Sequence, residues 1–289
     1  MYLSMSLILG FLILAHAPFL SAGEPQKIDD GGMVFKEAGP GAPEDIDFTS
    51  TLDGTVQKYV RILPPGYKVG DQRDALICLH GHGSDRGQYI KLPRGETKGA
   101  RDTAAKYGMI LVSPDYRTNS WMGPKGEADV LQIISDLRSK QGVKRIFLTG
   151  GSMGGTSVLI FTILHPELIA GVASLNGMAN MVEYDKFSEA IVPSYGGTKA
   201  EKPDEYKKRS AELFPHKFTM PVAITAGGKD TAVPPQSVLR LGDALKKINQ
   251  HVLVINRETT GHSTNYEDTV AAIEFVIKAA APWNAARKK

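Results

Sequence analysis

A serine framed by glycines constrains this chain more than any other feature of its sequence. Residues 150–154 read Gly-Gly-Ser-Met-Gly, a G-x-S-x-G pattern with Ser152 at its centre. An apolar run at residues 146–148 comes immediately before it, and residues 156–164 form an apolar stretch that stops before Pro166. This order predicts a buried strand, a sharp turn and a helix, the geometry that lifts a serine hydroxyl clear of a sheet. We therefore expect a nucleophile; the alternative is an ordinary glycine turn.

The first residues of the chain have the pattern of a secretory signal peptide, which we place at residues 1–23. Residues 7–15 are apolar and uncharged, and small residues at positions 21–23 follow Pro18. No Lys or Arg precedes the apolar run, so an uncleaved anchor and a buried helix stay open as alternatives. No later stretch reaches the ~18 to 20 apolar residues of a spanning helix. We expect a secreted or periplasmic protein without a stable membrane span after cleavage.

The rest of the chain has the size of a single domain. Residues 24–44 are rich in Gly and Pro and are expected to form an irregular leader, and residues 45–289 can bury one large core. The formal net charge is +3, and basic residues do not cluster with aromatics, so nucleic acid is not an expected partner. Cys78 is the only cysteine, so it cannot form an internal disulfide.

Strand and helix patterns alternate through this domain. Two alternating runs around Asp53 and Gly54 predict an antiparallel hairpin at one edge. The buried strands that we expect after it are residues 75–79, 109–113, 146–148, 171–175, 221–226 and 251–255. Helical patterns between them argue for a mostly parallel central sheet with helices on both faces. In such a sheet, functional sites lie beyond the carboxyl ends of the strands.

One long segment, residues 176–220, interrupts the alternation. It lies before the strand at residues 221–226, and its aromatic residues are interspersed with charges. Long insertions in compact domains are usually functional, so a lid over the site is one interpretation. A surface excursion that packs on its own aromatic side chains is the other.

A nucleophilic serine needs an imidazole that takes its proton and a carboxylate that orients the imidazole. His262 follows the last predicted strand in a glycine-containing loop, so it is the expected base, with His216 as the reserve. Asp230 follows the next-to-last predicted strand and is the expected acid. A turn or N-cap aspartate is the alternative reading of Asp230, and Asp115 is the reserve. A catalytic triad in the chain order Ser152, Asp230, His262 is typical of α/β-hydrolases.

The glycine-rich loop at residues 79–84, Leu-His-Gly-His-Gly-Ser, follows the first central strand and is expected to complete an oxyanion hole. The expected donors are the backbone amides of His82 and Met153, the second being the residue after the nucleophile. His80 and His82 also form an H-x-H pair that could bind zinc, but no third histidine lies nearby. We therefore predict no metal and no cofactor.

These motifs resemble the α/β-hydrolase superfamily, and the similarity extends over nearly all of the predicted domain. Residues 79–83 match its oxyanion loop, residues 150–155 its nucleophile elbow, residues 228–234 its acid loop and residues 261–262 its histidine loop. Four motifs in the correct order are much more specific than any one of them. The resemblance implies the α/β-hydrolase fold, with a short insertion or lid before the acid strand.

Within the superfamily, the sequence most resembles secreted feruloyl or acetyl esterases of the depolymerase type and the catalytic domain of prolyl-oligopeptidase-like hydrolases. Residues 195–197, followed by Arg209 and Ser210, are similar to the second group, which makes Tyr195 a candidate substrate contact. Trp121 is another candidate, because it follows a predicted strand and could stack on an aromatic acid or a sugar. A packing anchor is the alternative for Trp121.

The sequence thus predicts a secreted serine hydrolase that cleaves carboxylic esters through an acyl-enzyme. Feruloyl or acetyl esters of plant or algal polysaccharides are the expected substrates. A prolyl-oligopeptidase-like peptidase is one alternative, although only a few tens of residues precede the domain, too few for a propeller. A non-catalytic binding protein on a hydrolase fold is the other alternative, since a fold does not determine a function.

Overall fold

The structure is a computed structural model that describes residues 41–93 and 95–286, with side chains up to Ala280. The predicted signal peptide and most of the predicted leader lie outside the described residues. The first strand starts at Pro43, two residues inside the predicted leader. None of the helices in the described part combines the length and the apolarity that a membrane span requires.

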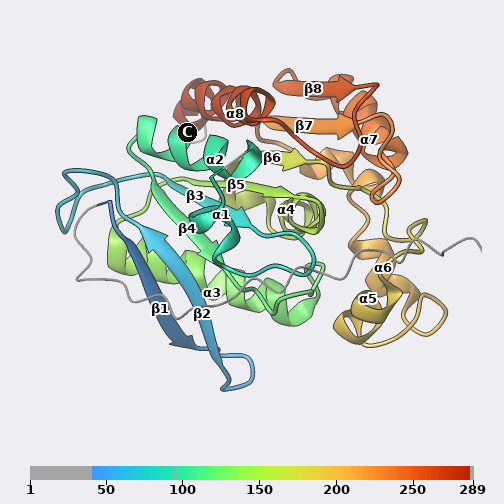
Figure 1. Cartoon of the computed structure of the whole chain (residues 1–289), viewed down its shortest axis with the longest axis horizontal. Coiled ribbons are helices and arrows are strands. Elements are labelled where there is room, and N and C mark those ends of the chain that lie inside the picture. The colour runs from blue at the N-terminus through green and yellow to red at the C-terminus, as the bar shows by residue number, and fades with distance from the viewer. Residues whose placement is uncertain (1–40, 94, 287–289) are drawn as a thin grey trace, which may run out of the picture. The chain divides into compact units, whose positions relative to one another are not determined.

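An eight-stranded sheet forms the centre of the domain, in the order β1-β2-β4-β3-β5-β6-β7-β8 (Figure 1). The strands are β1 (Pro43–Thr49), β2 (Val56–Ile62), β3 (Ala75–Leu79), β4 (Ile110–Pro114), β5 (Ile146–Gly151), β6 (Ile169–Leu175), β7 (Val222–Gly227) and β8 (Val252–Arg257). β2 pairs antiparallel with β1 and β4, and every other neighbouring pair is parallel. The predicted edge hairpin and the mostly parallel sheet are confirmed.

Helices cover both faces of the sheet, and two further helices, α5 (Ser188–Tyr195) and α6 (Pro203–Lys208), lie in the insertion (Figure 1). The others are α1 (Gln88–Lys91), α2 (Gly95–Lys106), α3 (Pro124–Gln141), α4 (Met153–Leu164), α7 (Gln236–Lys246) and α8 (Tyr266–Ala286). Apolar side chains of α2 and α8 join one buried cluster, and those of α3, α4 and α7 join the other. The α/β-hydrolase fold predicted from the sequence is therefore present, with helices on both faces.

The alternation of side chains along β3 shows why the sheet needs cover on both sides. Ala75, Ile77 and Leu79 belong to one cluster, and Leu76 and Cys78 belong to the other. All five are fully buried, and burying a Leu or Ile side chain stabilises a fold by about 1.5–3 kcal/mol. A five-residue apolar run can achieve this only as a central strand between two helical layers.

The insertion at residues 176–220 is fixed to the body of the domain rather than hinged over it. Arg209, only 1% exposed, donates to the carbonyl of Met122 at 2.6 Å, to Glu127 at 2.7 Å and to Glu205 at 2.8 Å. Breaking such a buried, fully hydrogen-bonded pair is strongly destabilising. Tyr184 of the same segment belongs to the main core cluster. These contacts favour a segment that packs on the body of the domain over a mobile lid.

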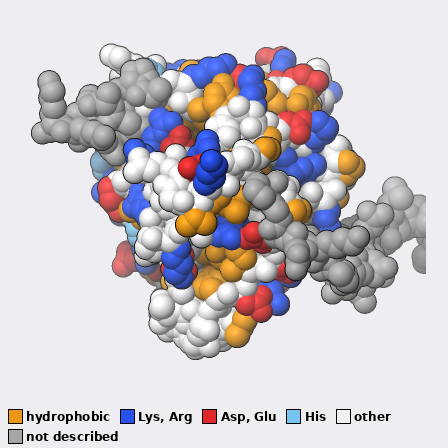
Figure 2. All heavy atoms as spheres, turned by 90° about the vertical axis from the view of Figure 1, so that its left-hand side faces the viewer, with side chains coloured by type: hydrophobic (Ala, Val, Ile, Leu, Met, Phe, Trp, Pro, Cys, Tyr) orange, Lys and Arg blue, Asp and Glu red, His pale blue; other side chains and the backbone are white. Residues whose placement is uncertain are grey.

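Charges of both signs intermingle at the surface. On the face shown in Figure 2, basic side chains are interspersed with acidic ones. Along the edge hairpin, Lys58 pairs with Asp47 and Arg61 pairs with Glu44. Alternating charge of this kind does not form the basic stripe that would attract a nucleic-acid backbone to this face.

Candidate active site

Ser152 occupies the sharp turn between β5 and α4. Its backbone has φ +59° and ψ −121°, a combination that a residue with a side chain rarely adopts. The turn packs directly on β3, because a Cβ added to Gly154 would lie 1.9 Å from the carbonyl oxygen of Leu79. Glycine at this position therefore lets the elbow approach the neighbouring strand, and the strained serine projects beyond the end of the sheet.

The structure brings Ser152, His262 and Asp230 together from the loops after β5, β8 and β7. Nε2 of His262 lies 2.8 Å from Oγ of Ser152, and Nδ1 of His262 lies 2.6 Å from Oδ2 of Asp230. The carboxylate accepts a hydrogen bond from Nδ1–H, which leaves Nε2 to accept the serine proton. The serine, base and acid expected from the sequence thus form one continuous chain of hydrogen bonds.

Two backbone groups fix the second oxygen of Asp230. Oδ1 accepts from the amides of Ala232 and Val233, each at 2.9 Å. The Asp230 side chain is almost fully buried, whereas His262 is partly exposed. These hydrogen bonds fix the orientation of the Asp230 carboxylate, and its hydrogen bond to Nδ1 in turn orients the imidazole of His262.

The two reserve residues lie in other surroundings. Asp115 accepts from the backbone amide of Arg86 at 2.9 Å and from its guanidinium at 3.0 Å. His216 lies in a short turn beside Phe214. Neither residue contacts Ser152 or His262 in the described part of the chain.

The histidine loop is held by a polar network that the sequence analysis missed. Asn176, the first residue after β6, hydrogen-bonds to Thr264 and, at 3.5 Å, to the carbonyl of Gly261. Thr225 lies 2.7 Å from Thr264, oxygen to oxygen. Asn176 follows β6, Thr225 lies within β7 and Thr264 lies in the histidine loop. Such scattered polar residues do not form a sequence motif, so only the fold reveals that they support the loop of His262.

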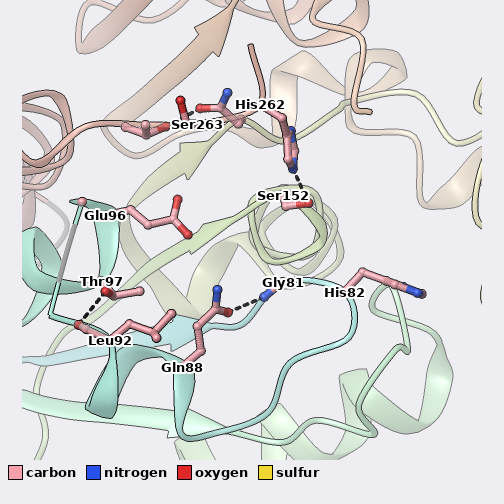
Figure 3. Close-up of a pocket in the computed structure, with 12 residues that line it drawn as sticks. Gly81, His82, Gln88, Leu92, Glu96, Thr97, Ser152, His262 and Ser263 are labelled. Atoms are coloured by element: carbon pink, nitrogen blue, oxygen red, sulfur yellow. Dashed lines mark hydrogen bonds between the residues drawn. The ribbon is translucent and has the colours of Figure 1, made fainter. Parts of the chain in front are cut away.

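The glycine-rich loop after β3 lies against the nucleophile. A Cβ on Gly81 would lie 3.7 Å from Cβ of Ser152, and the amide of Gly81 donates to Oε1 of Gln88 at 2.7 Å. Within the described residues, the amides of His82 and Met153 have no hydrogen-bond acceptor. The side chain of His82 points away from Ser152 (Figure 3). The backbone amides of His82 and Met153, which the sequence predicts as oxyanion donors, can therefore still donate a hydrogen bond to a ligand.

Trp121 and Tyr195 do not take the positions expected of substrate contacts. Their side chains are 0% and 2% exposed, and neither lines the cleft at Ser152. Trp121 instead donates from Nε1 to Nδ1 of His82 at 3.2 Å, and Tyr195 donates from its hydroxyl to the carbonyl of Trp121 at 2.9 Å. Trp121 thus supports the loop at residues 79–84 directly, and Tyr195, which belongs to the insertion, supports Trp121.

Aromatic side chains of the insertion contact both the glycine-rich loop after β3 and the loop that carries Asp230. The ring centroids of Tyr184 and Phe187 lie 5.5 and 5.2 Å from that of Trp121, and Phe187 lies 4.6 Å from His82. The hydroxyl of Tyr184 donates to the carbonyl of Ala232 at 3.0 Å. One aromatic cluster thus braces the loops that carry His82 and Asp230.

The H-x-H pair does not converge on a common point. Nδ1 of His80 lies 2.8 Å from the carbonyl of Gly81, and Nε2 lies 3.1 Å from the carbonyl of Asp115. Nδ1 of His82 accepts from Trp121. Among the described residues, no group of three or more His, Cys, Asp or Glu side chains could hold a metal ion.

A cleft of about 500 Å³ opens beside Ser152. Much of its wall is polar. Besides Ser152 and His262, the described residues that line it include Gln88, Leu92, Glu96, Thr97, Asn176 and Thr264. Burial raises the pKa of Glu96 to about 7. Glu96 could not be recognised from the sequence, since a glutamate in the first turn of a helix is common at exposed positions and belongs to no motif.

We predict that Glu96→Gln makes the stability of the protein less dependent on pH. Because the fold raises the pKa of Glu96 above its usual 4.5, ionisation disfavours the folded state as pH rises from about 4.5 through 7. The melting temperature of the wild type should therefore fall relative to that of the variant between pH 5 and pH 8. Glu189→Gln, at an exposed site, is the control. A constant difference between wild type and Glu96→Gln across this range would contradict the prediction.

The family model that matches the sequence is that of the prolyl oligopeptidase family, over residues 102–277. Among curated proteins, a 2-hydroxy-6-oxononadienedioate/2-hydroxy-6-oxononatrienedioate hydrolase of Paraburkholderia phymatum is 25% identical over 45% of this chain and 48% of its own length. The acetyl esterase Axe7A of Xylanibacter ruminicola is 27% identical over 43% of this chain and 29% of its own. The chain thus spans about half or less of the length of these relatives.

Among solved structures, the fluorophosphonate-binding serine hydrolase FphF of Staphylococcus aureus superposes with a TM-score of 0.62. The alignment covers 84% of this chain and 99% of that protein, at 21% sequence identity. At this level of identity the likeness concerns the fold. It agrees with the eight-stranded sheet described above.

Proposed function

The chain belongs to the prolyl oligopeptidase family of α/β serine hydrolases, and on that basis we propose that it hydrolyses carboxylic esters through an acyl-enzyme on Ser152. The observation that carries this proposal is the hydrogen-bond chain from Ser152 Oγ through His262 to Asp230. A serine hydroxyl becomes a competent nucleophile when an oriented imidazole accepts its proton as it attacks.

In the proposed reaction, Oγ of Ser152 attacks the ester carbonyl while Nε2 of His262 takes the hydroxyl proton. Asp230 stabilises the imidazolium that forms. The imidazolium then gives its proton to the leaving alcohol, and the acyl group stays on Ser152. In the second half, His262 takes a proton from water, the hydroxide attacks the acyl-enzyme, and Ser152 recovers its proton as the carboxylic acid leaves.

The tetrahedral intermediate places a negative charge on the former carbonyl oxygen. We propose that the amides of His82 and Met153 donate to it, since Gly81 already donates to Gln88. One such donor is typically worth about 2.7–4 kcal/mol of transition-state stabilisation. Trp121 and Tyr195 would then act indirectly, by fixing the loop that carries the His82 amide.

For the substrate, we propose acetyl or feruloyl esters linked to plant or algal polysaccharides, cleaved outside the cytoplasm. The partial similarity to an acetyl esterase supports this class. The cleft wall contributes the polar groups of Gln88, Thr97 and Asn176, which can bind sugar hydroxyls. Secretion rests on the signal-peptide pattern of residues 1–23.

Peptidase activity is the second candidate, because the matching family model is named for oligopeptidases. The same serine, base and oxyanion donors would acylate on an amide, so the site geometry alone does not separate the two reactions. The third candidate, a non-catalytic binding protein, is disfavoured by the hydrogen-bonded serine and by the strained backbone that projects it.

A panel of esters and amides tests these alternatives. We expect turnover of p-nitrophenyl acetate, methyl ferulate and acetylated xylan, and much slower turnover of a prolyl p-nitroanilide. The measurement is kcat/KM for each, with Ser152→Ala as the blank. Faster cleavage of the amide would favour the peptidase, and loss of activity on both feruloyl and xylan-linked esters would remove the polysaccharide assignment. Absence of all turnover and of fluorophosphonate labelling would favour the binding protein.

A further inference from the structure

The cleft contains an acidic side chain that the proposed reaction does not use. Glu96 lies in the first turn of α2 and lines the same cleft as Ser152. In the view of Figure 3, its carboxyl group and the side chain of His82 lie on opposite sides of Ser152. The carboxyl group therefore lies in the wall of the cleft into which Ser152 opens.

The elbow is shaped to receive this carboxyl group. A Cβ added to Gly151, the residue before the nucleophile, would lie 2.3 Å from Oε1 and 2.4 Å from Oε2 of Glu96. Any side chain at position 151 would occupy the place of the carboxylate. Glycine before Ser152 thus leaves room for an acid next to the nucleophile.

No cation neutralises Glu96 in the part of the chain that the structure describes. The described lining of the cleft contains neither Lys nor Arg. Arg101, on the same helix, donates instead to the carbonyls of Tyr89 and Leu92, each at 2.7 Å. An ionised carboxylate without a cationic partner attracts a positive charge more strongly in a partly buried cleft than in bulk water.

We propose, on the basis of the hydrolase function above, that Glu96 makes the cleft select substrates with an ammonium group over neutral substrates of the same shape. The ammonium would supply a positive charge that no Lys or Arg of the described lining provides, and it would form a charge-assisted hydrogen bond or a close ion pair with the carboxylate. Glu96 is in this view a specificity-determining residue of the substrate site, and the reaction at Ser152 is unchanged.

This selectivity depends on pH. Because the pKa of Glu96 is raised to about 7, its carboxyl is largely neutral at pH 6 and largely ionised at pH 8. Among the described residues, the other titratable groups near it include Tyr89 of α1, whose pKa burial raises, and His262, which lines the same cleft. Burial lowers the pKa of His82, which disfavours its protonated form, and its side chain lies on the other side of Ser152 (Figure 3). The preference for a cation should therefore increase as pH rises through about 7.

Matched pairs of substrates measure this preference on either side of the ester bond. The p-nitrophenyl ester of β-alanine carries an ammonium in its acyl part, where the p-nitrophenyl ester of butyric acid carries a methyl group. Acetylcholine carries its cation in the alcohol part, and 3,3-dimethylbutyl acetate is its neutral counterpart. The quantity to measure is the ratio of kcat/KM for each cationic ester to that of its neutral partner, corrected for spontaneous hydrolysis. Both esters of a pair use His262 as the base, so the contribution of His262 to the rate largely cancels in this ratio.

For at least one pair, the wild-type ratio should rise between pH 6 and pH 8. Glu96→Gln should lower the ratio at pH 8 roughly tenfold, the size of one charge-assisted hydrogen bond, and should remove its rise with pH. Glu96→Asp keeps the charge and should retain most of the preference. Glu189→Gln removes an exposed carboxylate that lies outside this cleft and should leave the ratio unchanged.

Two further measurements keep the test decisive. If Glu96→Gln does not fold, inhibition of the wild type replaces it as the test. Choline is compared with 3,3-dimethylbutan-1-ol, and β-alaninamide with butyramide. In at least one pair, the cationic compound should inhibit more strongly than its neutral partner, and this difference should be larger at pH 8 than at pH 6. Ratios that neither pH nor Glu96→Gln alters, in both pairs, would overturn the proposal while leaving ester hydrolysis intact. Failure of the wild type to hydrolyse either neutral ester would instead refute the proposed function.

Discussion

Replacing Ser152 by Ala should lower kcat for p-nitrophenyl acetate by on the order of 10⁶-fold, the loss seen when the nucleophile of a serine hydrolase is removed. The hydroxyl at this position accounts for the covalent step, because it is the group within 2.8 Å of Nε2 of His262. No other side chain at the elbow can form the acyl-enzyme. Rates of p-nitrophenol release and labelling by a fluorophosphonate probe measure the effect.

Ser263→Ala is the matched control for this variant. Ser263 lines the same cleft, but it lies in the histidine loop and not on the elbow. It should still permit labelling, whereas Ser152→Ala should abolish it. Substantial activity or labelling in a folded Ser152→Ala protein would refute the proposed mechanism.

Asp230→Asn should lower kcat by on the order of 10⁴-fold with little change in the fold. The amides of Ala232 and Val233 donate to Oδ1, so an asparagine would keep its carbonyl oxygen at that position. Its NH₂ group would then face Nδ1 of His262 and would force the proton onto Nε2. The imidazole could then no longer accept the proton of Ser152.

Asp115→Asn tests the reserve acid in the same assay. Asp115 pairs with Arg86 and does not touch His262, so its replacement should have a far smaller effect on kcat. Circular dichroism should confirm that both variants are folded. A larger loss in Asp115→Asn than in Asp230→Asn would contradict the assignment of the acid.

The fold and the positions of the three hydrogen-bonded residues were accessible from the sequence because each depends on a short local pattern. The glycines around Ser152 predict the strand, turn and helix. The loops of Asp230 and His262 follow apolar runs with strand patterns: β7 is buried as expected, whereas β8, expected to be buried, is a partly exposed strand at the edge of the sheet. In a parallel sheet the carboxyl ends of neighbouring strands meet at one edge, so the order of the elements already brings these loops together.

Trp121 and Tyr195 show where this reasoning fails. A tryptophan after a strand is equally compatible with a substrate platform and with a packing anchor. The choice depended on Tyr184 and Phe187, which cover Trp121 from a segment more than sixty positions further along the chain. That segment has no strand periodicity, so its path over the oxyanion loop could not be predicted.

The sequence by itself determined the α/β-hydrolase architecture, the elbow at Ser152 and the loops of its partners, since local periodicity and glycine positions encode strands and turns. Only the tertiary structure placed Glu96 beside the nucleophile and closed the insertion over Trp121. The physical reason is that the burial and charge of a side chain depend on neighbours distant in sequence. The carboxyl of Glu96 acquires its raised pKa only when α2 packs against the elbow.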